Sequence, residues 1–209
     1  IPLIKKTANT KKPVFLSSGL SSYKDLSLAI KTLKKKKCKK IVLMKCTSAY
    51  PAPHDEINLM TMLDFKKKFN VEIGFSDHTI GIETSIAAVA LGAKVVEKHI
   101  TLKQKKNSVD GFFSSDLKEF EKLVKSIRNI EKNLGKITYN VSKSSKKNLG
   151  GKKSLYVIKN INKNEIFTSD NFSSIRPAYG LHPKYYPIIL GKKAKKILKI
   201  GDRIKKSFY

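Results

Sequence analysis

Cysteines and long apolar stretches are scarce in this 209-residue chain, and their scarcity narrows the class of protein. Only two cysteines, Cys38 and Cys46, are present. Two thiols are too few for a disulfide framework and are typical of free cysteines in a reducing cytoplasm, where we expect the protein to work. No run of about 18 apolar residues occurs, and the first residues lack the apolar region of a secretion signal. We therefore expect neither a membrane span nor secretion.

Arginine is also scarce, although the formal net charge is +28. Arg128, Arg176 and Arg203 are the only arginines, and all other basic residues are lysines. Direct readout of nucleic-acid bases and bidentate phosphate binding favour the planar arginine side chain. Because the lysines are spread along the chain, we interpret them as solvated helix faces and expect no nucleic-acid partner. A basic nucleic-acid-binding protein is the alternative from another class, and it predicts binding that weakens steeply with salt.

Residues 1–136 repeat one unit, a short apolar strand followed by an amphipathic helix. Strands are predicted at 13–17, 41–46, 71–76 and 94–100, and helices at 21–36, 58–69, 83–91 and 116–134. This spacing favours parallel strands joined by right-handed crossovers. Four such units make half of an eight-stranded barrel. We therefore predict an α/β fold, the C-terminal half (strands 5–8) of a (β/α)8 TIM barrel without its N-terminal half; a small open α/β sheet is the competing interpretation.

The composition changes after residue 136. Residues 137–152 are rich in Ser, Lys, Asn and Gly and lack an apolar pattern, which predicts a linker. Residues 153–209 contain short β-like runs at 155–158 and 188–190 between many turn signals. The segments 161–166 and 197–204 resemble each other, which indicates a small β-rich domain with internal pseudo-symmetry. A domain of this size buries little surface, so we expect it to dock onto something larger.

Polar residues follow the predicted strands, at the end where parallel barrels carry their function. The third strand ends in Ser76-Asp-His78 and the fourth in Glu97-Lys-His99. Side-chain alternation places Ser76 with His78, and Glu97 with His99, on one face. The histidines lie one strand–helix unit apart, so they can meet on neighbouring strands and hold a divalent metal ion, with Glu97 as a further ligand or as a supporting partner. A network of hydrogen bonds without metal is the alternative.

Hydroxyl groups follow the first two strands. Ser17 and Ser18 end the first strand, and Thr47 and Ser48 follow the second. Hydroxyls and free backbone N–H groups beside helix N-termini suit a phosphate or a carboxylate. Ordinary helix capping explains each of them equally well when it is taken alone.

The order of these motifs resembles one known family. The runs are Pro13-Val-Phe-Leu-Ser-Ser-Gly19, Lys45-Cys-Thr-Ser-Ala-Tyr-Pro-Ala-Pro53, Gly74-Phe-Ser-Asp-His-Thr79 and Ala90-Leu-Gly-Ala-Lys-Val-Val-Glu-Lys-His99. They are similar to the N-acetylneuraminate (sialic acid) synthase family of nonulosonic acid synthases. The tail, with Phe167-Thr-Ser-Asp-Asn171 and Ile175-Arg-Pro177, resembles the antifreeze-like SAF domain, a β-clip fold, that closes this family. Residues 45–53 and 175–186 are most similar to its pseudaminic acid synthase branch.

The resemblance implies a transferase. It would condense phosphoenolpyruvate with an open-chain acetamido sugar, most specifically 2,4-diacetamido-2,4,6-trideoxy-altrose, to give pseudaminic acid and phosphate. N-acetylneuraminate or legionaminate synthesis is the alternative. The family is a barrel plus SAF domain that forms a domain-swapped homodimer. Its N-terminal phosphate-binding segment has no counterpart here. Because half a barrel has open sheet edges, we expect these 209 residues alone to be inactive; a catalytically dead assembly fragment is a third interpretation.

The resemblance also implies roles for individual residues. His78 and His99 would hold Mn²⁺ or Mg²⁺ and, together with Glu97, form the catalytic group. Phosphoenolpyruvate would be contacted by Ser17, Ser76 and either Thr47 or Ser48. The sugar would face Tyr50 and Asp110, and Arg176 would reach its acyl-amino group in the site of the partner subunit. The loop 103–107 departs from the family in being more basic than usual.

Overall fold

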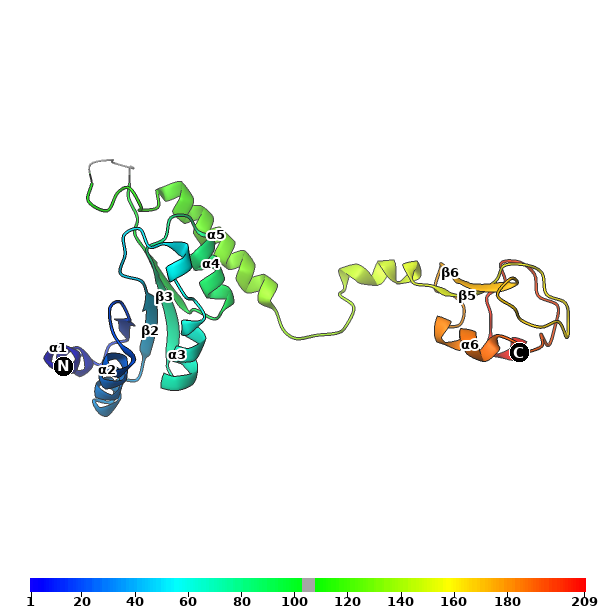
Figure 1. Ribbon diagram of the computed structural model, residues 1–209, viewed down its shortest axis with the longest axis horizontal. Coiled ribbons are helices and arrows are strands. Elements are labelled where there is room, and N and C mark those ends of the chain that lie inside the picture. Colours follow the sequence, from blue (N-terminus) through cyan, green and yellow to red (C-terminus); the bar gives the residue numbers. More distant parts are fainter. Residues whose placement is uncertain (103–107) are drawn as a thin grey trace. The chain divides into compact units, whose positions relative to one another are not determined.

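The computed structural model describes residues 1–102 and 108–209, and the basic loop 103–107 lies outside the described residues. The chain separates into two compact units, Ile1–Lys136 and Ile137–Tyr209 (Figure 1). Each unit has an apolar core of its own. Within the described ranges, none of the helices is both long enough and apolar enough to cross a membrane.

The first unit is built around one parallel sheet. Its strands β1 (Val14–Ser17), β2 (Ile41–Cys46), β3 (Glu72–Asp77) and β4 (Val95–Lys98) pair in the order of the chain. Every pairing is parallel. An open doubly wound sheet would reverse its strand order at a switch point, whereas a barrel adds each strand to the same edge. The prediction of half a barrel, rather than a small open sheet, is confirmed.

Helices follow the strands in turn and cover one face of the sheet. They are α2 (Tyr23–Lys35), α3 (Thr61–Phe69), α4 (Glu83–Ala90) and α5 (Leu117–Leu134). The start of α2 is a capping box in which Ser22 and Asp25 each accept the backbone N–H of the other, as their spacing predicts. The main core between helices and sheet includes Leu26, Ile30, Leu43, Met62, Phe65, Phe69, Ile73, Phe75 and Ala88.

Side chains alternate between this core and the other face of the sheet. Leu16 packs against the core, whereas its neighbour Phe15 is 57% exposed. Phe75 is buried in the core, and Ser76 therefore points to the opposite face. That face is the one which lines the interior of a closed barrel.

One helix was not predicted from the sequence, and another begins later than predicted. An additional helix, α1 (Pro2–Asn9), precedes β1 and packs Ala8 into a small cluster with Leu33 of α2. The helix expected from residue 58 begins at Thr61, after the 3₁₀ turn η1 (His54–Glu56). Asn58 has a φ of 49°, which is a left-handed conformation that a right-handed helix does not contain.

The second unit is small and β-rich. Strands β5 (Ser154–Val157) and β6 (Phe172–Ile175) pair antiparallel, and isolated bridges join the other segments. They enclose a core of Leu155, Val157, Ile161, Phe167, Phe172, Ile189, Ala194, Leu198, Ile204 and Phe208. Before β5, within residues 137–152, lies the exposed 3₁₀ helix η2 (Ser144–Gly151).

The β-like run predicted at 188–190 is wrong. Its first two residues belong to a short helix, α6 (Tyr186–Ile189), which follows the 3₁₀ turn η3 (Pro183–Tyr185), and Leu190 is the C-cap of α6. A proline lies in the first turn of each of these elements. Proline is well tolerated there because the first N–H groups of a helix have no partner within it. The prolines therefore mark helix starts, which the apolar run alone did not reveal.

The two similar segments of the second unit form matching turns. Ile161 and Leu198 exchange two backbone hydrogen bonds, of 2.9 and 2.8 Å. Three residues further on, Asn164 and Gly201 both have positive φ angles, of 71° and 88°. These matching features support the internal pseudo-symmetry, which remains a prediction.

Gly180 offers a test of packing in this unit. A Cβ added there would lie 2.6 Å from the carbonyl oxygen of Leu155, so the backbone would have to shift. We expect Gly180→Ala to lower the free energy of unfolding by about 1–3 kcal/mol, as other overpacking changes do. The measurement is urea unfolding of the second unit, followed by NMR through the backbone amide signal of Leu155. The control is Gly151→Ala, whose Cβ would meet nothing within 4 Å; equal stability of both variants would contradict the prediction.

Candidate active site

His78 and His99 meet at the carboxyl ends of β3 and β4. Asp77 and Lys98 are register partners, so the histidines that follow them are neighbours across the two strands. Their ring centroids lie 5.2 Å apart with an angle of 75° between the rings. The predicted convergence of the two imidazoles is therefore confirmed.

A backbone contact determines which nitrogen of His78 carries its hydrogen. Nδ1 of His78 lies 2.9 Å from the carbonyl oxygen of Thr47. A carbonyl oxygen only accepts, so Nδ1 is the donor, and in the neutral imidazole Nε2 keeps its lone pair. Metal-binding histidines have this arrangement, in which the second nitrogen donates to a carbonyl or carboxylate. His99 Nδ1 lies 3.8 Å from a carboxylate oxygen of Asp110, an ion-pair distance longer than a hydrogen bond.

Aromatic rings surround the histidine pair. The Tyr50 ring lies 4.4 Å from His78, and the Phe113 ring lies 4.8 Å from His99 and 5.7 Å from Tyr50. The Tyr50 loop is held by the N–H of Ala52, which donates to the His78 carbonyl at 3.0 Å. Phe113 is buried, whereas Tyr50 is 51% exposed and free to meet a ligand. Sequence analysis did not single out Phe113, and its place three residues after Asp110 was the available signal.

Glu97 is engaged with Ser76 rather than with the histidines. The Ser76 hydroxyl donates to Glu97 Oε1 at 2.6 Å across the β3–β4 pair. In the ranges 1–102 and 108–209, no three His, Cys, Asp or Glu side chains gather closely enough to hold a metal ion. The contact of Glu97 with Ser76 suits the role of a supporting partner, and both predicted roles of Glu97, as a further ligand or as a supporting partner, remain predictions. Two adjacent imidazoles, one with its Nε2 lone pair free, still fit a divalent ion as a partial ligand set.

The loops after β1 and β2 bring further hydroxyls to the same end of the sheet. Ser17 is exposed at the last position of β1. The ammonium of Lys45 lies 3.1 Å from the hydroxyl of Thr47, and burial lowers the pKa of this lysine. A Cβ on Gly19 would lie 3.2 Å from the Ser48 hydroxyl, so the glycine lets the two loops approach each other. The phosphate-binding roles expected here remain predictions.

Arg176, which was expected to reach the sugar, belongs to the second unit. It is exposed and directly follows β6. Its role remains a prediction.

A buried ion pair that sequence analysis did not identify lies beside the histidines. Lys98 Nζ is 3.1 Å from Asp77 Oδ2, and the two side chains are 2% and 0% exposed. Asp77 also accepts the N–H and the hydroxyl of Thr79, at 2.8 and 2.7 Å, and the hydroxyl of Ser85 in α4 at 2.5 Å. Lys98 further donates to the Thr79 carbonyl at 2.7 Å. The sequence signal for this network was the presence of charged residues at the ends of two mostly apolar strands, β3 and β4.

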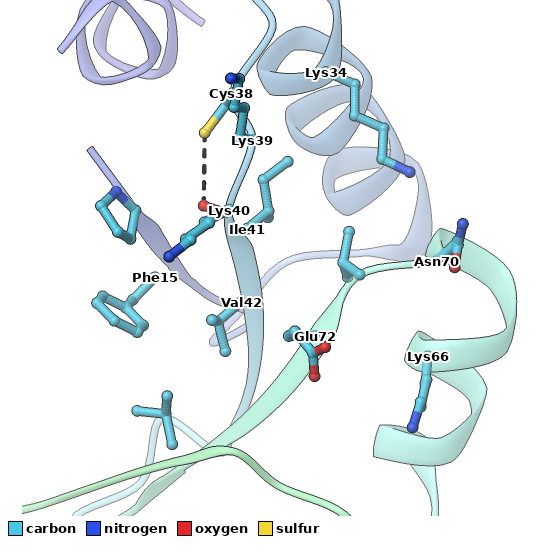
Figure 2. A pocket seen from close by; sticks show the side chains of 13 residues that line it. Phe15, Lys34, Cys38, Lys39, Lys40, Ile41, Val42, Lys66, Asn70 and Glu72 are labelled. Atoms are coloured by element: carbon cyan, nitrogen blue, oxygen red, sulfur yellow. Dashed lines mark hydrogen bonds between the residues drawn. The ribbon is translucent and has the colours of Figure 1, made fainter. Parts of the chain in front are cut away.

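A cavity of about 720 Å³ lies away from these groups, at the amino ends of the strands (Figure 2). Its apolar lining includes Phe15 and Val42, the second residues of β1 and β2, and Val95, the first residue of β4. Lysines line it as well, among them Lys34, Lys39, Lys40 and Lys66. In parallel barrels this end serves stability and the carboxyl end serves chemistry, so the cavity is not part of the candidate site.

Comparisons with known proteins agree with the family resemblance and with the fold. The NeuB family model matches residues 1–139 and the SAF domain model matches residues 152–208. Pseudaminic acid synthase of Campylobacter jejuni subsp. jejuni serotype O:23/36 (strain 81-176) is 41% identical over 204 residues, which cover 98% of this chain and 60% of the relative. N,N'-diacetyllegionaminic acid synthase of Campylobacter jejuni subsp. jejuni serotype O:2 (strain ATCC 700819 / NCTC 11168) is 40% identical over 208 residues, 98% of this chain and 62% of the relative.

A solved structure is similar as well. The N-acetylneuraminic acid (sialic acid) synthetase from Leptospira borgpetersenii serovar Hardjo-bovis, in complex with citrate, matches with a TM-score of 0.65 and 34% identity. The match covers 71% of this chain and 52% of that structure. The chain thus spans about 60% of the length of the pseudaminic acid synthase that it matches.

The buried ion pair makes a stability prediction. Lys98→Met leaves the Asp77 carboxylate buried without its counter-charge, and breaking such a pair costs about 3–5 kcal/mol. The matched control is Lys68→Met, which removes the partner of Asp64 at an exposed 3.0 Å pair on α3. That change should cost about 0–1 kcal/mol. Urea unfolding of both variants is the measurement, and a Lys98→Met cost no larger than that of Lys68→Met would refute the prediction.

Proposed function

The chain belongs to the NeuB family, and from this premise we propose that it forms part of a nonulosonic acid synthase. The enzyme would condense phosphoenolpyruvate with an open-chain acetamido sugar and release phosphate. The observation that carries the proposal is the His78–His99 pair at the carboxyl end of a parallel sheet, with Nε2 of His78 free to bind a metal. The succession of a NeuB region and a SAF domain in one chain supports it.

We propose pseudaminic acid as the product and 2,4-diacetamido-2,4,6-trideoxy-altrose as the sugar. The similarity to pseudaminic acid synthases over nearly the whole chain supports this choice. The almost equal similarity to a legionaminic acid synthase favours legionaminate as the second candidate, and N-acetylneuraminate as the third.

His78 and His99 would hold the metal ion, Mn²⁺ or Mg²⁺, through their imidazole nitrogens. The bound ion would supply a Lewis acid for the aldehyde of the open-chain sugar. The Thr47 carbonyl keeps the hydrogen of His78 on Nδ1, away from the ligand side. Because no third His, Cys, Asp or Glu of the described residues joins the pair, other coordination positions remain for substrate and water.

The reaction joins C3 of phosphoenolpyruvate to the aldehyde carbon, adds water at C2 and releases inorganic phosphate. Ser17, Ser76 and either Thr47 or Ser48 would bind phosphoenolpyruvate. The hydrogen of the Ser76 hydroxyl already points to Glu97, so Ser76 would donate to the ligand only after that hydrogen turns away from Glu97. Holding both substrates in one orientation removes much of the entropic barrier to a reaction between two molecules.

The exposed Tyr50 ring beside His78, and Asp110 beside His99, would face the sugar. We further propose a domain-swapped homodimer in the cytoplasm, in which Arg176 binds the acyl-amino group of the sugar in the site of the other subunit. The net charge of +28 would speed the encounter with anionic phosphoenolpyruvate in a salt-dependent manner.

The metal role is tested by activity. For the product of the complete coding sequence, we expect phosphate release to stop in EDTA and to return with Mn²⁺. His99→Gln should lower kcat about a hundredfold or more, the scale on which transition-state electrostatic contacts act. His182→Gln is the matched control, because His182 is an exposed histidine of the second unit. Full activity in the chelator would remove the metal from the proposal.

The contribution of the SAF domain is tested by kinetics. Arg176→Ala should raise the KM for the sugar about tenfold, equivalent to ~1.4 kcal/mol of binding, and change the KM for phosphoenolpyruvate little. Arg128→Ala is the control, since Arg128 is exposed on α5 and pairs with Glu131 at 2.8 Å. An unchanged sugar KM in Arg176→Ala would exclude this arginine from the site.

A further inference from the structure

The Asp77–Lys98 pair lies on the face of the sheet opposite to the histidines. Alternation along β3 and β4 turns Asp77 and Lys98 toward the helices, where Ser85 of α4 meets Asp77. The next residues, His78 and His99, turn toward the open face. We propose that this buried ion pair is a positioning device that sets the spacing and the angle of the two imidazoles. The inference deepens the proposed function, because it assigns a role in the same metal site.

The ion pair replaces backbone pairing where the sheet ends. The register of β3 and β4 runs from Gly74 with Val95 to Asp77 with Lys98 and ends there. Beyond that point the Lys98 ammonium continues the link by donating to the Thr79 carbonyl at 2.7 Å. These side chains therefore connect the strand ends that carry the histidines.

The same network holds the backbone on both sides of His78. On one side is Asp77, whose carboxylate accepts the N–H and the hydroxyl of Thr79. On the other side is Thr79, whose carbonyl is bound by Lys98. A histidine between two such anchors cannot rotate its backbone without breaking hydrogen bonds to buried charges. Lys98 directly precedes His99 in the chain. The contact between Lys98 and Asp77 therefore restrains the imidazole rings of both His78 and His99.

Stability alone does not account for such a pair. The cost of removing two charges from water offsets most of their attraction, and apolar residues of similar volume are often as stabilising. Unlike apolar residues, an ion pair fixes the orientation of the groups around it through directional hydrogen bonds. Asp77 accepts such bonds from three groups besides Lys98. Partners that orient metal ligands typically change metal affinity 10- to 100-fold when they are removed.

Proton NMR can test the proposal on the 209-residue chain. The chain has four histidines, so the ring Hε1 region contains four signals, which His→Gln substitutions assign. The 5.2 Å spacing of His78 and His99 should give a nuclear Overhauser effect between their rings. Titration with Mn²⁺ alone should broaden these two signals selectively and yield a Kd.

The decisive variant replaces both charges, Asp77→Leu with Lys98→Met, and so leaves no buried charge unpaired. We expect the variant to fold, to lose the contact between the rings, and to bind Mn²⁺ about 10- to 100-fold more weakly. The matched control, Asp64→Leu with Lys68→Met, removes an exposed ion pair of α3 and should leave both readouts unchanged. A double variant that keeps the ring contact and binds Mn²⁺ within twofold of the parent would overturn the positioning role.

If the double variant does not fold, Thr79 provides a milder test. Thr79→Val removes the hydroxyl that donates to Asp77 and keeps the side-chain shape, whereas Thr79→Ser keeps the hydroxyl. We expect a weaker ring contact in Thr79→Val and rescue in Thr79→Ser; identical spectra of the two would overturn the inference. Failure of the unaltered chain to bind Mn²⁺ would instead refute the proposed metal site, while the ring contact would still decide the positioning role.

Discussion

The meeting of β3 and β4 at their carboxyl ends is the contact on which the candidate site depends. Consecutive residues of these strands serve opposite faces, because side chains alternate along a strand. On the helix face, Asp77 and Lys98 form a buried pair that is hydrogen-bonded to Thr79 and Ser85. On the other face, His78 and His99 come within 5.2 Å of each other. The packing that closes the core therefore also determines where the imidazoles lie.

The two ends of the strands have different roles: the amino ends contribute to stability, and the carboxyl ends carry the candidate site. At the amino ends, the apolar side chains of Phe15, Val42 and Val95 line a cavity together with lysines (Figure 2). At the carboxyl ends, the same face carries Ser76 and Glu97, which are joined by a hydrogen bond. Parallel strands make this division possible, because all of their carboxyl ends, and the loops that follow them, lie at one edge.

The second unit has a different architecture from the first and a core of its own. Its antiparallel pair and its matching turns enclose large apolar residues, with Phe167, Phe172 and Leu198 fully buried. Few residues of regular structure are needed, since backbone hydrogen bonds such as those between Ile161 and Leu198 join its loops. The succession of NeuB region and SAF domain gives this unit a place in the proposed enzyme, where Arg176 would be its contribution.

The sequence by itself determined the half-barrel, the family and the convergence of His78 with His99. Each of these follows from periodicity, from spacing or from ordered motifs, which are local properties of the chain. Only the tertiary structure decided that the Thr47 carbonyl binds His78, that Phe113 covers His99, and that Asp77 pairs with Lys98. Such contacts join loops and strands that lie far apart in the chain, so their geometry depends on how the whole unit packs.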